Sequence, residues 1–536
     1  MKQYSFLLVL LLSAVLSINS YADDFVDAVK ALNVGSFNNK IEAVNDLQSL
    51  NDERSLLVLY AMLEGRLLTN DEEAEFIIYD ENTDTNTNPF TLEIVTNVSS
   101  DSFKKVRTNN RLRRNIRTAI ASLELYAEDT GKRMSAAKNL INNSDASLVE
   151  IIRDAYEKES VAKIKSTLAI ALALIDVNSD DQSVRLQSID ILSEAVDSEA
   201  LAVLNRLSAL NDDGDFLEQD VVVAKAAANG VKSIERKLST YGTMENLFFG
   251  LSLGSVLLLA AVGLAITFGV MGVINMAHGE MIMLGAYTTY VVQLIMPNFL
   301  EWSLLVAIPA AFLVAGAVGI LIERVVIRHL YGRPLETLLA TFGISLILQQ
   351  AVRSIFSPLN RQVITPDWMS GSFEINAALS LTYNRFYIIW FSLIVVAALM
   401  ILLKNTQLGL QMRAVTQNRP MANAMGIRSS WVDALTFGLG SGIAGIAGVA
   451  LSQLTNVGPN LGQAYIIDSF MVVVFGGVGN LFGTVFAAMS LGVINKFIEP
   501  SMGAVLGKIL ILVMIILFIQ WRPRGLFALK GRAVED

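Results

Sequence analysis

Residues 246–279 read NLFFGLSLGSVLLLAAVGLAITFGVMGVINMAHG and contain no aspartate, glutamate, lysine or arginine. About 20 apolar residues in a helix that rises 1.5 Å per residue match the ~30 Å hydrocarbon core of a bilayer. This stretch therefore predicts a membrane-spanning helix over residues 247–269. Comparable apolar stretches predict further spans at about 281–300, 302–322, 335–352, 386–403, 431–453 and 504–520. The second half of the chain is thus predicted to be a polytopic α-helical membrane domain.

The 536 residues are too many for one compact domain, and charge divides the chain into two halves. Hydrophobic residues make up 53% of the chain, charged residues only 17%, and the mean hydropathy is +0.48. The first 240 residues hold 25 basic and 38 acidic side chains, whereas the remainder holds 16 basic and 12 acidic ones. We predict a signal peptide over residues 1–22, an all-α extracytoplasmic domain over 23–240 and a transmembrane permease domain over 241–536.

Composition excludes several kinds of chemistry. The chain has no cysteine and only two histidines, so disulfides, thiolate catalysis and cysteine-based zinc sites are ruled out. We expect no metal site, no cofactor and no catalytic residue. The acidic first half lacks the basic stripe that nucleic acid requires. No G-x-x-x-x-G-K-[ST] phosphate loop occurs, so any ATP that drives this protein must bind another subunit.

The first 240 residues begin like a secreted protein. Lys2, the apolar run 6–16 and the small residues around Ala22 predict a cleavable signal, with an uncleaved anchor as the alternative. Further on, apolar residues recur at helical spacing and indicate three helix pairs, which suggest a HEAT-like stack. An ordinary helical bundle is the alternative, and residues 80–88 are expected to form an exposed loop. The predicted helix pairs cover residues 41–63, 134–156 and 186–207.

Basic residues between the spans indicate the orientation of the membrane domain. They cluster after the third predicted span, after the fifth and in the tail, so these segments are expected in the cytoplasm and the first domain outside. This orientation requires residues 465–494 to enter and leave the membrane as a broken hairpin. We expect its turn against the solute path, because broken backbone at membrane depth must be covered by protein or water. The glycines that predict the turn are Gly476, Gly477, Gly479 and Gly483.

Polar residues interrupt the apolar sequence at 275–280. A carboxylate at the bilayer centre costs about 2.5–3.5 kcal/mol on insertion scales, so Glu280 is expected to face a partner or water. Asn275 offers donors and acceptors to an amide solute, and His278 could pair with Glu280 across a turn. We interpret the three as candidates for a translocation path. A short cytoplasmic turn with a capping Asn275 and a solvated Glu280 is the alternative.

A second set of path candidates brackets the glycine-rich turn. Gln463 and Asp468 precede the turn and Asn480 lies within it. Asp468 is expected near an outer mouth, and capping at the membrane interface is the alternative for this residue.

The 25-residue loop from Lys404 to Arg428 connects two predicted spans. Its helical spacing gathers alanine and methionine on one face, which is the pattern of a small helix that docks in a groove of a partner protein. A solvated connector is the alternative. The residues that we assign to such docking are Arg413, Ala414, Ala422, Met425, Gly426 and Ile427.

Two glycine patterns could be mistaken for catalytic or phosphate-binding motifs. Residues 250–254 fit G-x-S-x-G, but they lie in a charge-free apolar stretch rather than at a strand-to-helix turn. The glycines of 438–448 include a small-xxx-small pair, Gly438 and Gly442. Both patterns indicate close helix packing, which leaves an intramembrane hydrolase as a remote alternative.

At these motifs the chain resembles a known family. Residues 275–287, NMAHGEMIMLGAY, are similar to the N-x-A-H-G-E-…-G-A-Y signature of the branched-chain amino-acid type of ATP-binding cassette (ABC) importer permease. Residues 475–483 resemble its G-G-x-G-x-x-x-G element. Residues 413–427 resemble its cytoplasmic coupling segment, with Gly426 at the glycine position and without the Glu-Ala-Ala opening.

The resemblance implies a transport subunit of an importer in the bacterial inner membrane, with its first domain in the periplasm. It also implies a second permease subunit, two cytoplasmic ATPase subunits, a periplasmic solute-binding protein and surrounding lipid as partners. The long N-terminal extension resembles the urea branch of the family, so urea is the expected solute. A branched-chain amino acid is the alternative, and a membrane-anchored sensor or scaffold is a more distant one.

Overall fold

The computed structural model describes residues 24–33, 36–50, 52–70, 75–80, 85–95, 103–142, 148–376 and 378–527. The chain divides into two compact units, Met1–Lys237 and Leu238–Asp536. The predicted signal peptide lies outside the described residues.

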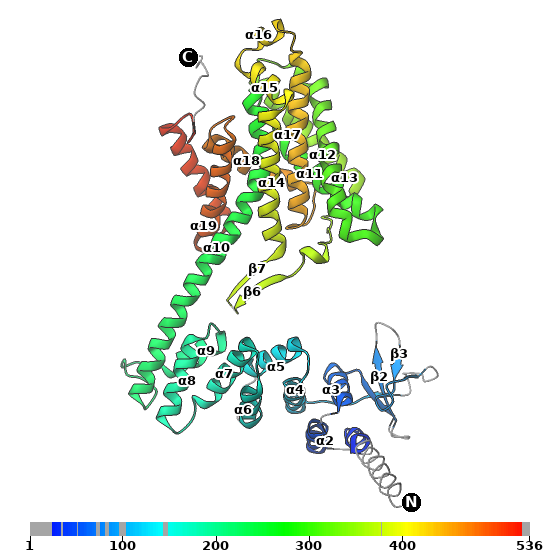
Figure 1. Ribbon diagram of the computed structural model, residues 1–536, viewed down its shortest axis with the longest axis vertical. Helices are drawn as coiled ribbons and strands as arrows, with labels where there is room; N and C mark the ends of the chain where they lie inside the picture. Colours follow the sequence, from blue (N-terminus) through cyan, green and yellow to red (C-terminus); the bar gives the residue numbers. More distant parts are fainter. Residues whose placement is uncertain are drawn as a thin grey trace, which may run out of the picture. The chain divides into compact units, whose positions relative to one another are not determined.

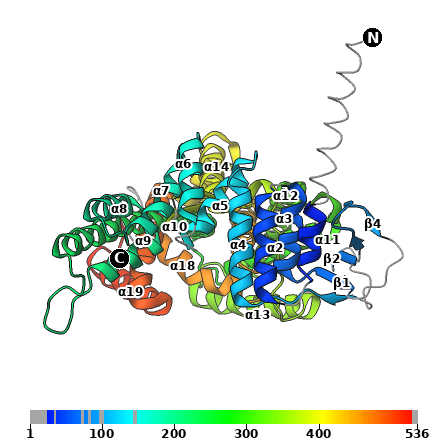
Figure 2. The same cartoon turned by 90° about the horizontal axis from the view of Figure 1, so that it is seen from below.

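The first unit is built mainly from short amphipathic helices. Polar caps start many of them: the side chains of Ser36, Asp52, Asn109, Asp181 and Asp197 each accept a backbone N–H of the first turn. Figure 2 shows α2, α3 and α4 side by side, and their apolar faces share one core. Residues 24–31 are helical. The later helices are α2 (Phe37–Ser49), α3 (Glu53–Glu64), α4 (Asn110–Glu124), α5 (Thr130–Asn142), α6 (Val149–Lys158), α7 (Ala162–Asp176), α8 (Gln182–Glu194) and α9 (Ser198–Leu207).

The prediction of an all-α first domain is wrong between α3 and α4, where five strands form an antiparallel sheet in the order β4-β3-β2-β1-β5. The runs 67–69 and 76–78 are buried, short and rich in β-branched and aromatic residues, which favours strands over helices. The sheet also interrupts the row of helix pairs, and part of the predicted 80–88 loop is strand. The strands are β1 (Leu67–Asn70), β2 (Glu75–Asp80), β3 (Thr85–Thr87), β4 (Ile94–Val95) and β5 (Lys104–Lys105).

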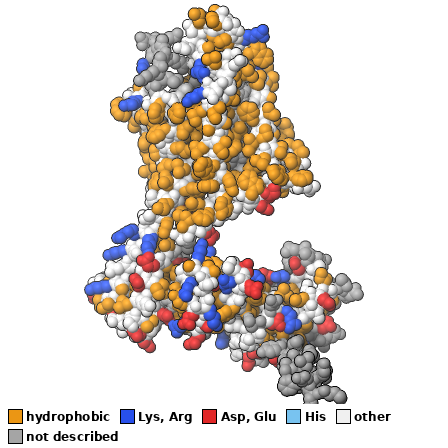
Figure 3. All heavy atoms as spheres, viewed as in Figure 1, with side chains coloured by type: hydrophobic (Ala, Val, Ile, Leu, Met, Phe, Trp, Pro, Cys, Tyr) orange, Lys and Arg blue, Asp and Glu red, His pale blue; other side chains and the backbone are white. Residues whose placement is uncertain are grey.

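The second unit is a bundle of apolar helices, and orange side chains cover much of its visible face in Figure 3. Among the described helices, six are long and apolar enough to cross a membrane: α10, α12, α13, α14, α17 and α19. The chain is therefore a multi-pass membrane protein. Helix α10 (Val221–Met271) begins in the first unit and continues into the second. The other helices are α11 (His278–Ile295), α12 (Leu300–Val325), α13 (Pro334–Phe356), α14 (Tyr383–Asn405), α15 (Gln407–Gln417), α16 (Arg419–Ala424), α17 (Ser429–Ser452), α18 (Leu461–Gly476) and α19 (Leu481–Trp521), with short 3-10 helices at Pro297–Phe299, Ile327–His329 and Asp367–Met369.

The two ends of this unit differ. A two-stranded hairpin, β6 (Ser372–Asn376) with β7 (Leu379–Thr382), lies at one end, and α15 and α16 lie at the other (Figure 1). Two of the basic segments meet at the second end: the Arg419 guanidinium stacks 4.6 Å from the ring centre of Tyr331, and that of Arg324 lies 4.2 Å from the ring of Trp431.

Helix α17 occupies the centre of the bundle because its small residues admit close neighbours. A Cβ on Gly445 would lie 2.6 Å from the Ala311 carbonyl oxygen of α12, and one on Gly440 would lie 2.6 Å from the Gly263 oxygen of α10. The prediction that the glycines of 438–448 serve helix packing is confirmed. Such contacts leave no room for larger side chains.

Helix α19 consists of two parts. Pro500 lies inside it, and Gly503 has the non-helical backbone angle φ +79°. A Cβ on Gly507 would lie 3.3 Å from Ile498, nine residues earlier, so the chain reverses between them. Residues 481–502 and 504–521 therefore form an antiparallel pair.

The predicted hairpin over 465–494 consists of α18 and the first part of α19, and the C-terminal tail packs on its glycine turn. Backbone N–H groups of Leu526 and Phe527 donate to the carbonyls of Phe475 (2.9 Å) and Gly476 (3.2 Å). The tail thus covers the turn and satisfies its backbone. Backbone conformation and close packing explain the glycine at 477. Gly477 has φ +102°, and a Cβ there would lie 2.7 Å from the Phe527 oxygen.

Candidate translocation path and coupling segment

Helix α11 begins inside the bundle rather than at its surface. The ring Nε2 of His278 lies 2.9 Å from the carbonyl oxygen of Ala260 in α10. Ala260 precedes the end of α10 at Met271 by eleven residues, which is about 16 Å of helix. Residues 272–277 therefore fold back along α10, so that α11 starts deep in the membrane unit. Non-helical backbone at this depth is typical of transporter sites, where it is covered by protein.

The fold-back segment satisfies its backbone locally. The Asn275 side-chain oxygen accepts the Ala277 N–H at 3.0 Å, and the Met276 N–H donates to the Thr341 hydroxyl at 3.1 Å. Asn275 is thus a cap, as the alternative interpretation supposed, but it is only 2% exposed. The solvated turn expected with that alternative is not found.

Glu280 is held by α13 and does not pair with His278. It is 1% exposed, and its Oε1 accepts hydrogen bonds from the Ser345 hydroxyl (2.9 Å) and the Gln349 amide (2.7 Å). Its Oε2 has no partner among the described residues. The carboxylate is therefore half satisfied, and one oxygen is left for a proton, water or solute.

A polar stripe runs along α13 toward α11. Thr337, Thr341, Ser345, Gln349 and Arg353 recur at every fourth position, and the first four are at most 3% exposed. Sixteen residues of helix correspond to about 24 Å, most of the thickness of a hydrocarbon core. This stripe was not predicted, although α13 has the lowest hydropathy of the six candidate spans and the spacing of four is visible in the sequence.

Further buried atoms in α11 and in the segment before it have no partner in the described part of the chain. Besides Glu280 Oε2, they are Asn275 Nδ2, His278 Nδ1 and Tyr287 Oη. A buried polar atom without a partner costs about 1–3 kcal/mol, so such a group in a membrane usually serves a function. Together with the stripe on α13, these groups form the candidate path.

The second set of predicted path residues does not come together. Gln463 is exposed. Asp468 accepts a hydrogen bond from Lys508 at 2.9 Å, beside a cavity of about 230 Å³. Asn480 caps α19 by accepting the Gly483 N–H at 3.2 Å, and its amide donates to the Phe527 carbonyl. Asp468 therefore borders a space that a solute could occupy.

The predicted coupling segment forms two short helices, α15 and α16. Arg413 donates to the Leu403 carbonyl of α14, and Ala414, Ala422 and Ile427 pack against the bundle. Gly426 has φ +88°, a conformation that favours glycine. Exposed apolar side chains project from the same segment: Leu410 61%, Met421 62% and Met425 77%.

A buried ion pair ties this segment to the bundle. The Arg419 guanidinium, at the start of α16, donates to both carboxylate oxygens of Asp433 in α17, at 2.7 and 3.0 Å. Asp433 is 1% exposed. Sequence reasoning missed this pair, because its two residues lie on different predicted elements and nothing in their spacing marks them.

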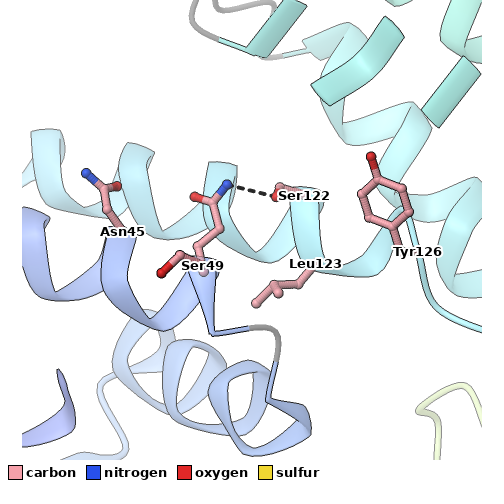
Figure 4. A pocket seen from close by; sticks show the side chains of 6 residues that line it. Asn45, Ser49, Ser122, Leu123 and Tyr126 are labelled. Carbon is pink, nitrogen blue, oxygen red and sulfur yellow. Dashed lines mark hydrogen bonds between the residues drawn. The ribbon is translucent and has the colours of Figure 1, made fainter. Parts of the chain in front are cut away.

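The first unit carries a separate open hollow of about 470 Å³ between α2 and α4 (Figure 4). Gln48 donates to the Ser122 hydroxyl across it at 2.9 Å, and Tyr126 at its edge donates to Asp154 at 2.7 Å. Burial and that hydrogen bond raise the pKa of Tyr126 to about 12. The hollow is lined mainly by neutral groups.

These features are those of a polytopic transport subunit: a bundle of apolar helices with an interior polar stripe and, at one end, the two short helices α15 and α16. Among the described residues, no cluster of His, Cys, Asp or Glu could hold a metal ion. Residues 246–519 match the family described as branched-chain amino acid transport system / permease component. The chain belongs to this family of transport components, which carry no catalytic domain of their own.

Curated relatives align with about half of the chain. The permease protein BraD of Pseudomonas aeruginosa, named for high-affinity branched-chain amino acid transport, is 29% identical over 53% of this chain and 96% of its own length. LivH of Salmonella typhimurium, named for the same transport, is 30% identical over 53% of this chain and 94% of its own. The ribose import permease RbsC of Escherichia coli K12 is 27% identical over 47% and 78%, respectively. No solved structure gives a significant match.

Proposed function

We propose that this chain is a permease subunit of an ABC importer that carries branched-chain amino acids across a bacterial inner membrane. The observation that carries the proposal is the buried polar stripe of α13, which faces the interior start of α11. A purely structural membrane helix would not need a row of hydrogen-bonding groups across its depth. The names of BraD and LivH support this solute, in place of the urea expected from the sequence.

The same proposal assigns the partners. The exposed Leu410, Met421 and Met425 form a small apolar face that suits a groove in an ATPase subunit. We assign two such ATPase subunits, a second permease subunit that completes the path and a periplasmic solute-binding protein. The first unit then lies in the periplasm, where the predicted signal would send it.

Urea is the second candidate solute. The matched family region, residues 246–519, lies within the second unit, and BraD and LivH each align with 53% of this chain. The first unit therefore lies outside the matched family region. The threonine, serine and glutamine side chains of the stripe also suit a neutral amide, which must recover several kcal/mol of lost hydration.

Uptake in cells tests the proposal. A strain that carries the partner subunits, with this chain deleted and then restored, would be given radiolabelled leucine and radiolabelled urea. We expect leucine uptake to disappear on deletion and to return on restoration, while urea uptake stays unchanged. Restoration of urea uptake alone would overturn the proposal in favour of the second candidate.

A further inference from the structure

A charged cavity of about 230 Å³ lies within the membrane unit, between α10, α14, α17, α18 and both parts of α19. Arg385 is the third residue of α14, and α14 starts directly after β7. The cavity therefore reaches the end of this unit that carries the β6–β7 hairpin. Pockets for drug-sized ligands are about 300–1,000 Å³, so a space of this size suits a single small metabolite.

Both signs of charge line this cavity. The Lys508 ammonium lies 2.9 Å from Asp468, and the Lys496 ammonium lies 2.5 Å from Glu499. Arg385 differs, because its guanidinium forms no hydrogen bond or ion pair with any of the described residues and only stacks 4.7 Å from the ring of Phe249. A cation within a membrane unit normally has an anionic partner, so Arg385 is available to an anion from outside the chain.

One wall of the same cavity is apolar. Leu253 and Val256 of α10, together with Leu451 and Leu454 at the end of α17, contribute it. Val256 and Leu451 are each 1% exposed. Three cations, two carboxylates and a hydrocarbon wall thus border one small space. The two lysines already pair with the carboxylates, which leaves Arg385 as the cation for the carboxylate of an amino-acid zwitterion and the apolar wall for its branched side chain.

We propose that this cavity is a binding site for the amino acid during transport. The carboxylate of the solute pairs with the planar guanidinium of Arg385, which suits bidentate binding. Its ammonium group lies toward Asp468 and Glu499, whose carboxylates it shares with Lys508 and Lys496, and its side chain packs on Leu451 and Leu454. This inference rests on the proposed function, and it adds the site and the groups that recognise the solute. Urea has no charge and would gain little from Arg385.

Equilibrium binding of radiolabelled leucine to the purified complete importer, without the solute-binding protein, tests the site. Arg385→Gln is expected to raise the Kd for leucine at least ten-fold, because a charge-assisted hydrogen bond contributes about 1.5–3 kcal/mol. Arg385→Lys should give an intermediate value. Arg522→Gln removes an exposed guanidinium at the far end of α19 and should leave the Kd unchanged. An unchanged Kd in Arg385→Gln, or no binding by the wild-type importer, would overturn the inference.

Two further measurements distinguish failure of this binding site from failure of the proposed function. Leucinol, which lacks the carboxylate, should compete with leucine at least ten-fold less well than leucine itself in the wild-type importer, and equal competition would overturn the site even if the variants failed to fold. ATP-driven leucine import is measured in parallel. Import without dependence on Arg385 would refute this site alone, whereas absence of import would refute the proposed function.

Discussion

The buried polar residues of α11 and α13 form hydrogen bonds with one another. Glu280 would be costly in an apolar bundle, yet Ser345 and Gln349 of α13 meet it at hydrogen-bond distance. Thr341 likewise satisfies the backbone of Met276, where the chain is not helical. These contacts hold the interior start of α11 against α13, and they leave one Glu280 oxygen available.

Replacement of Glu280 tests this arrangement. Glu280→Ala leaves the Ser345 and Gln349 donors without an acceptor, so we expect the bundle to lose about 1–3 kcal/mol of stability. Glu280→Gln keeps an acceptor oxygen and should cost less. Thermal unfolding of the purified protein in detergent measures both variants, and equal unfolding temperatures for Glu280→Ala and wild type would contradict the assigned contacts.

The sequence indicated Asn275, His278 and Glu280 because polar groups stand out in an apolar stretch. Their partners could not be predicted, since Ser345 lies 65 residues away and spacing within one helix says nothing about the helix beside it. Asp468 was recognised for the same reason as Glu280, whereas Arg385 was not, because an arginine at the start of a span is typical of an interfacial anchor.

Helix packing at the scale of elements depends on glycine in α17. A Cβ on Gly445 would meet the backbone of α12, whereas one on Gly343 of α13 would meet nothing within 4 Å. We predict that Gly445→Leu prevents folding and that Gly343→Leu is tolerated, although both place leucine in a membrane helix. Size-exclusion profiles of the two variants in detergent check this, and a monodisperse Gly445→Leu protein would argue against the close packing.

The Arg419–Asp433 pair fixes α16 to α17. Arg419→Met leaves the buried Asp433 carboxylate unpaired, which typically costs about 3–5 kcal/mol. We expect this variant to show a sharp loss of leucine uptake relative to the amount of importer assembled, because α16 no longer moves with α17. The control is Arg333→Met, which breaks an exposed ion pair with Glu336. Full uptake by Arg419→Met would exclude a role for the pair in coupling.

The elements of the membrane unit were largely predictable, and those of the first unit were less so. Long apolar runs leave few alternatives to a spanning helix. Strands of two to six residues, such as those between 67 and 105, give too short a pattern to stand out beside helical periodicity. The glycine-rich turn of 477–480 was recognised, but its cover could not be foreseen, because the tail that covers it lies more than 40 residues further along the chain.

The whole molecule joins an acidic unit to an apolar one, and low pH should act first on the acidic unit. Hydrogen bonds from Arg133 and Arg185 hold the pKa of Glu159 and that of Glu218 below their ordinary values. A glutamate whose pKa is lower in the folded protein than in the unfolded chain stabilises the folded state. This stabilisation is complete above the pKa of the unfolded chain, about 4.3, and is lost as the pH falls through the pKa of the folded protein.

Calorimetry of the full-length protein between pH 7 and pH 3 measures this effect. We expect the unfolding temperature of the first unit to fall below about pH 4. Glu218→Gln should lower this unfolding temperature at pH 7 and should make it depend less on pH. Parallel curves for the variant and the wild type would show that the Arg185–Glu218 pair has no part in the loss.

The central claim is that this chain carries an amino acid across the membrane when ATPase subunits act on it. Proteoliposomes that contain the complete importer, with ATP enclosed on the ATPase side and solute-binding protein on the other, test it most directly. We predict that radiolabelled leucine accumulates only with hydrolysable ATP. Accumulation that is indifferent to ATP, or no accumulation of leucine at all, would contradict the account.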